Sequence, residues 1–125
     1  MQDSLFKYMK VGLVHFMAYP TTIKGEGPII ETIKKLALDD YFNAIEITTI
    51  RNSEERQTIK KMLETSHMTV AYGAQPRLLT TGLNVNDLNE ECRLKALANL
   101  KEAIDEAYEI GASGFAFLSG KFEEA

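Results

Sequence analysis

Short apolar segments alternate along this chain with longer segments in which apolar residues recur every three or four positions. The short segments are rich in β-branched and aromatic residues, which favours strands, and the longer ones have the period of amphipathic helices. Strands that alternate with helices predict an α/β fold with parallel strands joined by right-handed crossovers. We expect strands at 10–16, 44–50, 68–73 and 114–120, and helices at 28–40, 54–64 and 87–110.

Individual residues mark the expected ends of the helices. Pro28 suits the first position of the first helix, and Ser53 is the expected N-cap of the second. Gly111 is the expected left-handed residue that ends the third helix. A loop at 74–86 precedes that helix. Its buried face is expected to consist of Ala96, Leu97, Leu100, Ala103, Ile104, Ala107 and Tyr108.

The composition fits one globular domain at 1–125. The 125 residues are 45% hydrophobic and carry a formal net charge of -4, which gives no reason to expect nucleic acid or an anionic membrane as a partner. Cys92 is the single cysteine and has no partner for an intramolecular disulfide, which fits a reducing compartment. No apolar run approaches the roughly 20 residues of a membrane-spanning helix. We therefore expect a cytoplasmic location.

Four parts of the pattern point to a known superfamily. They are the first strand Lys10–Phe16, the strand Ala44-Ile-Glu-Ile with its acid, the segment Thr69–Pro76, and the helix end at 103–112 that runs into 114–120. Their order resembles the N-terminal half of the xylose isomerase-like TIM barrels, the superfamily of sugar isomerases and epimerases. The resemblance implies a parallel-stranded (β/α)4 half of a TIM barrel, with four strands and three intervening helices. A full barrel needs about 250 residues, and a small doubly wound sheet is the alternative fold.

For function, the resemblance implies a metal-dependent sugar or sugar phosphate isomerase or epimerase. A divalent metal would hold neighbouring substrate oxygens while a proton moves next to a carbonyl. In that superfamily the metal-binding acids and histidine come mostly from strands after the fourth, so no metal ligand is assigned here and this chain alone is expected to be inactive. It would be the N-terminal portion of a longer chain, or a natural half that must assemble.

Two alternatives remain open. The first is a non-catalytic half-barrel that associates with itself, because the first and fourth strands would leave unpaired sheet edges that invite a homo-oligomer. The second, which is less favoured, is a zinc apurinic endonuclease-like protein. DNA binding needs a basic surface, whereas this chain is acidic and has Gln75 where a histidine ligand would be sought.

Glu46 is the most informative candidate for substrate binding. It lies between Ile45 and Ile47, so its side chain points to the opposite face of the strand. A lone carboxylate under helices would be costly, so we expect Glu46 on the inner face of the barrel. There it would bind a substrate hydroxyl or support a metal site, or it would pair with a basic residue in a purely structural role.

Four further residues are candidates for binding a sugar or sugar phosphate. His15 is expected near the end of the first strand, on the face where barrels hold their active sites, although a structural hydrogen bond would also explain it. Tyr72, Gln75 and Arg77 surround the end of the third strand and offer a hydroxyl, an amide and a fixed cation. The alternative for these three residues is a loop that packs its own polar groups.

Overall fold

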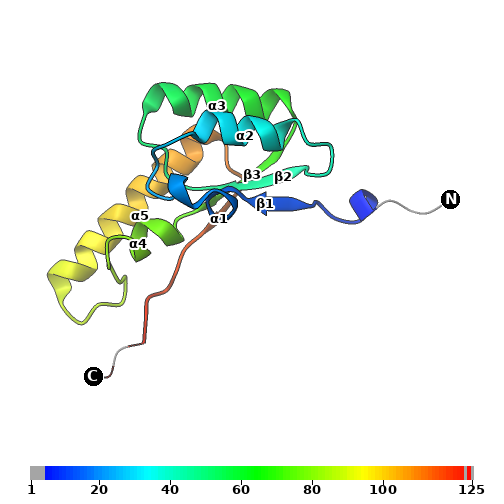
Figure 1. Cartoon of the computed structure of the whole chain (residues 1–125). Coiled ribbons are helices and arrows are strands. Elements are labelled where there is room, and N and C mark those ends of the chain that lie inside the picture. Colours follow the sequence, from blue (N-terminus) through cyan, green and yellow to red (C-terminus); the bar gives the residue numbers. More distant parts are fainter. Residues whose placement is uncertain (1–4, 123, 125) are drawn as a thin grey trace.

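The computed structural model describes residues 5–122 and 124, which form a four-stranded sheet with helices on its outer side (Figure 1). All strand pairs are parallel, and the strands lie side by side in their order along the chain. A doubly wound sheet would reverse the strand order at a switch point, so this sheet is the half-barrel. The strands are β1 (Gly12–Val14), β2 (Ala44–Ile47), β3 (Thr69–Gly73) and β4 (Gly114–Ala116).

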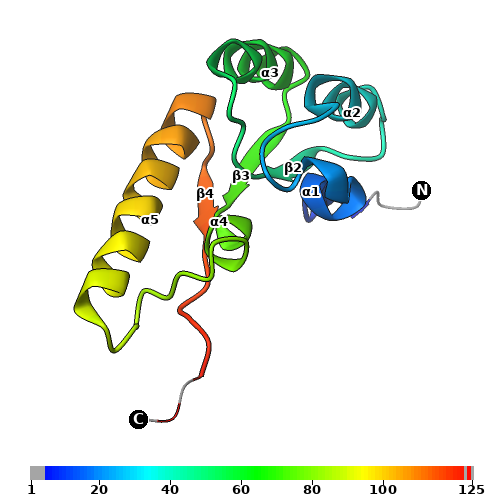
Figure 2. The same cartoon turned by 60° about the vertical axis from the view of Figure 1, so that its left-hand side comes forward.

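Three helices cross over between successive strands, and they form an arc around the convex face of the sheet (Figure 2). They are α2 (Ile29–Ala37), α3 (Ser53–Thr65) and α5 (Glu90–Ile110). Within residues 5–122 and 124, no crossover helix lies on the other face of the sheet. Four shorter helical segments complete the described chain: η1 (Leu5–Lys7), α1 (His15–Ala18), η2 (Pro20–Thr22) and α4 (Gln75–Leu79).

The hydrophobic core lies between the convex face and the arc of helices. Ile45 and Ile47 are both 1% exposed, whereas Glu46 between them is only partly buried, as the alternation of side chains along a strand requires. Tyr72 of β3 is completely buried in the same layer, and its ring stacks on Phe115 of β4. Helix residues that close this core include Ile33, Ile59, Leu63, Leu100 and Ala103.

The strands are shorter than the sequence predicts. β2 ends at Ile47 and β4 at Ala116, and irregular chain follows both, whereas short helices follow β1 and β3. The first strand stops at Val14, and His15 opens α1. The expected loop at 74–86 contains α4, with Pro76 in its first turn. Both helices are too short to show an apolar period, which needs more than one or two turns.

The helix ends agree with the sequence in one case and differ in two. Gly111 has φ of +86° and ends α5 in the left-handed conformation, which confirms that prediction. Ser53 is not the N-cap of α3; Asn52 takes that place, and its side chain accepts hydrogen bonds from the backbone N–H groups of Glu54 and Glu55. Pro28 precedes α2 instead of opening it.

The expected buried face of the long helix is partly wrong. Leu97 is 37% exposed, Ile104 52% and Tyr108 87%, while Ala96, Leu100, Ala103 and Ala107 are buried as expected. The apolar residues of α5 lie on two adjacent faces of the helix, and the sequence pattern assigns both to the core. One face packs on the sheet, and the other is on the surface beside it.

Candidate functional site

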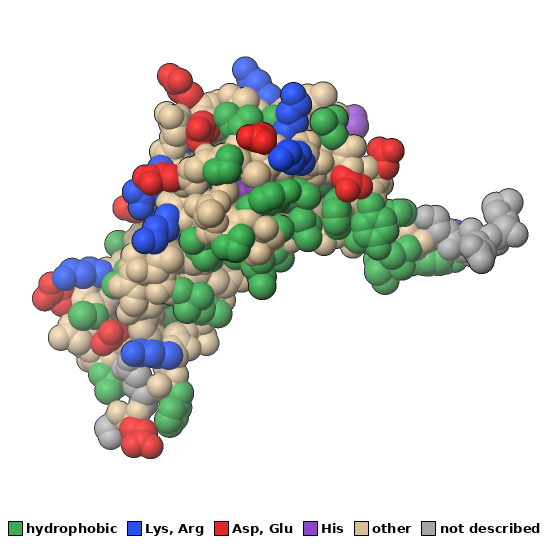
Figure 3. Space-filling view, in the orientation of Figure 1, with side chains coloured by type: hydrophobic (Ala, Val, Ile, Leu, Met, Phe, Trp, Pro, Cys, Tyr) green, Lys and Arg blue, Asp and Glu red, His purple; other side chains and the backbone are tan. Residues whose placement is uncertain are grey.

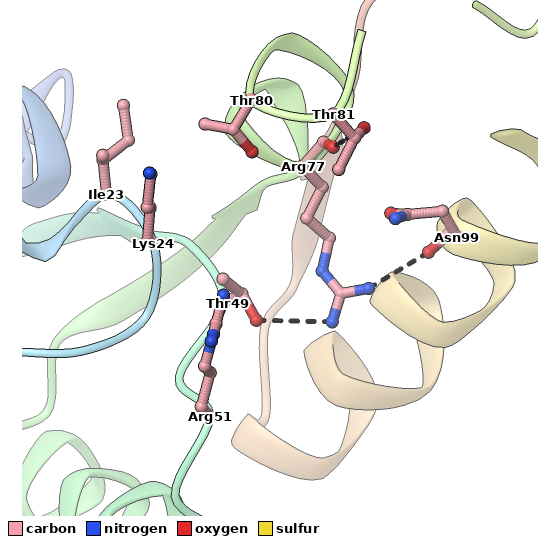
Figure 4. A pocket seen from close by; sticks show the side chains of 8 residues that line it. All are labelled: Ile23, Lys24, Thr49, Arg51, Arg77, Thr80, Thr81 and Asn99. Atoms are coloured by element: carbon pink, nitrogen blue, oxygen red, sulfur yellow. Dashed lines mark hydrogen bonds between the residues drawn. The ribbon is translucent and has the colours of Figure 1, made fainter. Parts of the chain in front are cut away.

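The loops that follow β1, β2 and β3 meet at the carboxyl edge of the sheet and enclose a cavity of about 370 Å³, called here the edge pocket (Figure 4). The carboxyl edge of a parallel sheet is where α/β proteins place their ligands. The lining is polar and basic, with three cationic side chains, three hydroxyls and one amide. It consists of Ile23, Lys24, Thr49, Arg51, Arg77, Thr80, Thr81 and Asn99.

Arg77 forms one wall of the edge pocket and is held by Glu106 of α5. The Nη2 atom of Arg77 donates to Glu106 Oε2 at 2.7 Å, and Nη1 donates to the Asn99 carbonyl at 3.2 Å. Glu106 is 8% exposed, and it also accepts from the Ile50 backbone N–H at 2.6 Å and from the Thr49 hydroxyl at 3.1 Å. The guanidinium is therefore fixed in place, and much of its charge is balanced inside the protein.

Tyr72 lies behind this ion pair in the core. Its hydroxyl is buried and has no hydrogen-bond partner among the described residues, although Arg77 and Glu106 are near it. Burial, and secondly the negative charge of Glu106, raise the pKa of this phenol well above its usual range. Tyr72 is therefore a neutral core residue and does not face the edge pocket.

The remaining two cations of the edge pocket are more open to solvent. Arg51 pairs with Glu26 at 2.9 Å, and both side chains are more than half exposed. Lys24 is exposed and makes no ion pair within the part of the chain that the structure describes. Exposed pairs are weak, so both cations can turn to an anion that enters the pocket.

Glu46 lies on the open face of the sheet and lines a second cavity of about 490 Å³, called here the face cavity. Gly73 makes room there: a Cβ at residue 73 would come closer than 3.0 Å to Glu46 Oε1 and to Gln75 Oε1. The Gln75 oxygen is buried and has no hydrogen-bond partner in the part of the chain that the structure describes. The other walls are Val14, Phe16, Met17, Ile23, Pro76, Leu79 and Leu118.

Glu46 and Gln75 together offer hydrogen-bonding atoms in otherwise apolar surroundings. The carboxylate accepts only, and the amide presents an oxygen or, after a half-turn, its NH₂ group. Ile23 lines both cavities, so the face cavity and the edge pocket adjoin at this side chain. One ligand could therefore reach both.

His15 is placed away from both cavities. Its Nε2 atom is 2.7 Å from the Thr32 hydroxyl of α2, its ring packs on Tyr19, and it is only 3% exposed. Burial lowers the pKa of this imidazole from 6.5 to about 4. The ring is therefore neutral at neutral pH and joins α1 to the helical layer.

This burial predicts a pH effect on stability. Between about pH 6.5 and pH 4 the unfolded chain binds a proton at His15 and the folded chain does not, so the free energy of unfolding falls as the pH drops through this window. An NMR titration of the His15 ring should give a midpoint near 4. The variant His15→Gln should lose stability less steeply over the same range. A midpoint near 6.5 would contradict the assignment.

The structure thus separates the five expected site residues into three places. Glu46 and Gln75 lie together on the open face. Arg77 lines the edge pocket with Tyr72 behind it in the core, and His15 contacts the helical layer away from the other four. The edge-pocket residues Lys24, Thr49, Arg51, Thr80, Thr81 and Asn99, together with Glu106, had not been expected. The sequence could have indicated Glu106, because this carboxylate lies among the apolar residues of the buried face of α5.

Within residues 5–122 and 124, no three histidine, cysteine, aspartate or glutamate side chains converge on a point where a metal could bind. The oxygens of Glu46 and Gln75 fall short of the donor sets that hold divalent metals. Because the described donors do not fit the metal that the resemblance implies, no chemical step is assigned to one here.

No protein-family model matches this chain, and no curated protein matches it either. Among the described residues, no helix is both long and apolar enough to cross a membrane.

Proposed function

We propose that this half-barrel is the substrate-binding portion of a sugar phosphate isomerase or epimerase-like protein. The carrying observation is the pair of Glu46 and the unpartnered Gln75 oxygen in an apolar cavity that adjoins a basic pocket. A polyhydroxylated ligand with an anionic end matches both halves of this arrangement. The superfamily resemblance and the cytoplasmic location stay predictions.

The face cavity would hold the sugar. Hydroxyl groups donate to the Glu46 carboxylate, and a charge-assisted hydrogen bond is strong where apolar side chains exclude water. The carbon skeleton would lie on Phe16 and Leu118, which line the same cavity. Gln75 would accept or donate a further hydrogen bond and so orient the ring or chain.

The edge pocket would hold the phosphate. Lys24 and Arg51 supply positive charge on exposed side chains. Thr80 and Thr81 lie just after α4, and their hydroxyls donate to the Pro76 and Arg77 carbonyls, so they would have to turn to reach a phosphate oxygen. Arg77 adds a fixed guanidinium, the side chain best shaped for phosphate oxygens. The groups that transfer the proton next to the carbonyl would come from outside the residues described here, as the resemblance implies.

Replacing Glu46 with glutamine is expected to weaken the binding of ribose 5-phosphate by about 10- to 100-fold, because a hydrogen bond to a charged group contributes about 1.5–3 kcal/mol. The melting temperature should hardly change, because the carboxylate lies on the open face and not in the core. Isothermal titration calorimetry and thermal denaturation of both proteins measure the two effects.

The matched control is Glu31→Gln, which removes the same charge from an exposed position on α2. Lys24→Met should weaken the binding of ribose 5-phosphate and of inorganic phosphate but leave the binding of ribose unchanged. The proposal is wrong if the wild-type chain binds none of these three probes at millimolar concentration, or if the Glu46 and Glu31 variants behave alike.

A further inference from the structure

Helix α5 carries an apolar flank that nothing in the described chain covers. Its members, called here the α5 flank, are spaced along one side of the helix for four turns. Their exposed fractions run from 37% to 87%, which is unusual for so many large apolar side chains on one helix. They are Leu94, Leu97, Ile104 and Tyr108.

The α5 flank points away from the rest of the protein. The opposite side of α5 faces α3, because Glu109 accepts from Arg56 at 3.0 Å and from Gln57 at 2.8 Å. Since the strands follow their chain order, the side of α5 away from α3 overhangs the free edge of β4. In a closed barrel another helix would lie in this position.

Both sheet edges are also open. Within the described residues, β1 pairs only with β2 and β4 pairs only with β3, so each has one row of unpaired backbone groups. The open face between them is largely apolar, and hydrophobic side chains gather below the strands and along the chain that leads into β1 (Figure 3). In that leading segment, Leu5 and Met9 are 47% and 55% exposed.

The total surface is large for this mass. The chain exposes 8084 Å² at 14.0 kDa, whereas a compact monomer of that mass exposes about 6,700 Å². The excess of about 1,400 Å² exceeds the roughly 800 Å² that each partner buries in a standard interface. Part of this excess belongs to the segments that extend from the sheet before β1 and after β4 (Figure 1), and the flank and the open edges contribute to the rest.

We propose that a second copy of this chain covers the α5 flank, with β4 of each copy beside β1 of the other. A two-fold rotation about the barrel axis joins both pairs of edges at once and keeps all strands parallel. The last turns of α5 lie where β4 begins, and the segment 5–9 lies where β1 begins. The rotation therefore brings Ile104 and Tyr108 to the segment 5–9 of the partner.

The mass in solution tests this pairing directly. Sedimentation velocity at micromolar concentration should show a dimer for the wild-type chain. Ile104→Glu and Tyr108→Glu should each weaken the dimer at least tenfold, because both place a charge against the segment 5–9 of the other copy. Lys95→Glu is the matched control, because Lys95 is exposed and lies nine residues before Ile104, on the opposite side of α5. Circular dichroism checks that each variant folds.

Cross-linking tests the geometry independently. With Cys92→Ser as background, Met9→Cys combined with Tyr108→Cys should cross-link into covalent dimers, whereas Met9→Cys combined with Glu102→Cys should not, because Glu102 faces Arg77. A wild-type monomer across the concentration range would overturn the proposal. A dimer unaffected by the flank variants would overturn it equally.

Discussion

Replacing Glu106 with alanine is expected to lower the free energy of unfolding by about 3–5 kcal/mol, the usual loss when one partner of a buried ion pair is removed. Glu106 is 8% exposed and Arg77 is held 2.7 Å from it. Without the carboxylate, the guanidinium loses its main counter-charge, and the Ile50 backbone N–H loses its acceptor. Urea denaturation of the wild-type and variant chains measures the difference.

The neighbouring acid provides the control for this prediction. Glu102 approaches the same Arg77 at 3.7 Å, but its side chain is 76% exposed, so Glu102→Ala should cost at most about 1 kcal/mol. Two variants of equal stability would show that burial does not decide the strength of this pair. The double variant Glu106→Ala with Arg77→Met should recover part of the loss, because it leaves no buried charge uncompensated.

Replacing Gly25 with alanine should destabilise the fold by about 2–5 kcal/mol, the sum of a left-handed backbone cost and of overpacking. Gly25 has φ of +79°, and an added Cβ would lie 2.8 Å from the Thr49 carbonyl oxygen. Its own carbonyl accepts from the Arg51 N–H at 3.0 Å. The clash would separate the loops after β1 and β2, so phosphate binding should fall with stability.

Gly82 gives the matched comparison. It has φ of +68°, but an added Cβ would meet nothing within 4 Å, so Gly82→Ala should cost only the backbone term of about 1–2 kcal/mol. Thermal denaturation of the two variants side by side isolates the contact with Thr49. If both variants lose the same amount, the close packing of Gly25 against Thr49 contributes nothing.

The order of strands and helices could be predicted because each one has its own local spacing of apolar residues. The alternation around Glu46 correctly predicts its place on the open face, and the three- and four-residue spacing predicts all three crossover helices. The same reasoning wrongly assigns Leu97 and Ile104 to the buried face of α5. A period cannot tell a face that packs on the sheet from one beside it, because that depends on which neighbours exist.

The composition of the edge pocket could not be predicted in the same way. Lys24, Arg51 and Asn99 lie on three separate segments, and only the packing of those segments brings them together. The split between Tyr72 and Gln75 has a similar origin. Gln75 lies three residues after Tyr72, but β3 ends at Gly73 and α4 begins at Gln75, whose side chain lies on the open face.

The neighbour-to-neighbour strand order has a consequence for how the chain folds during synthesis. Among the described residues, each strand pairs only with the strands next to it along the chain, so the ladders can form one after another as the chain leaves the ribosome, with little loop-closure entropy. The contacts of Glu106 with Thr49 and Ile50 span more than fifty residues. We therefore expect Arg77 to become fixed last, when most of α5 has been made.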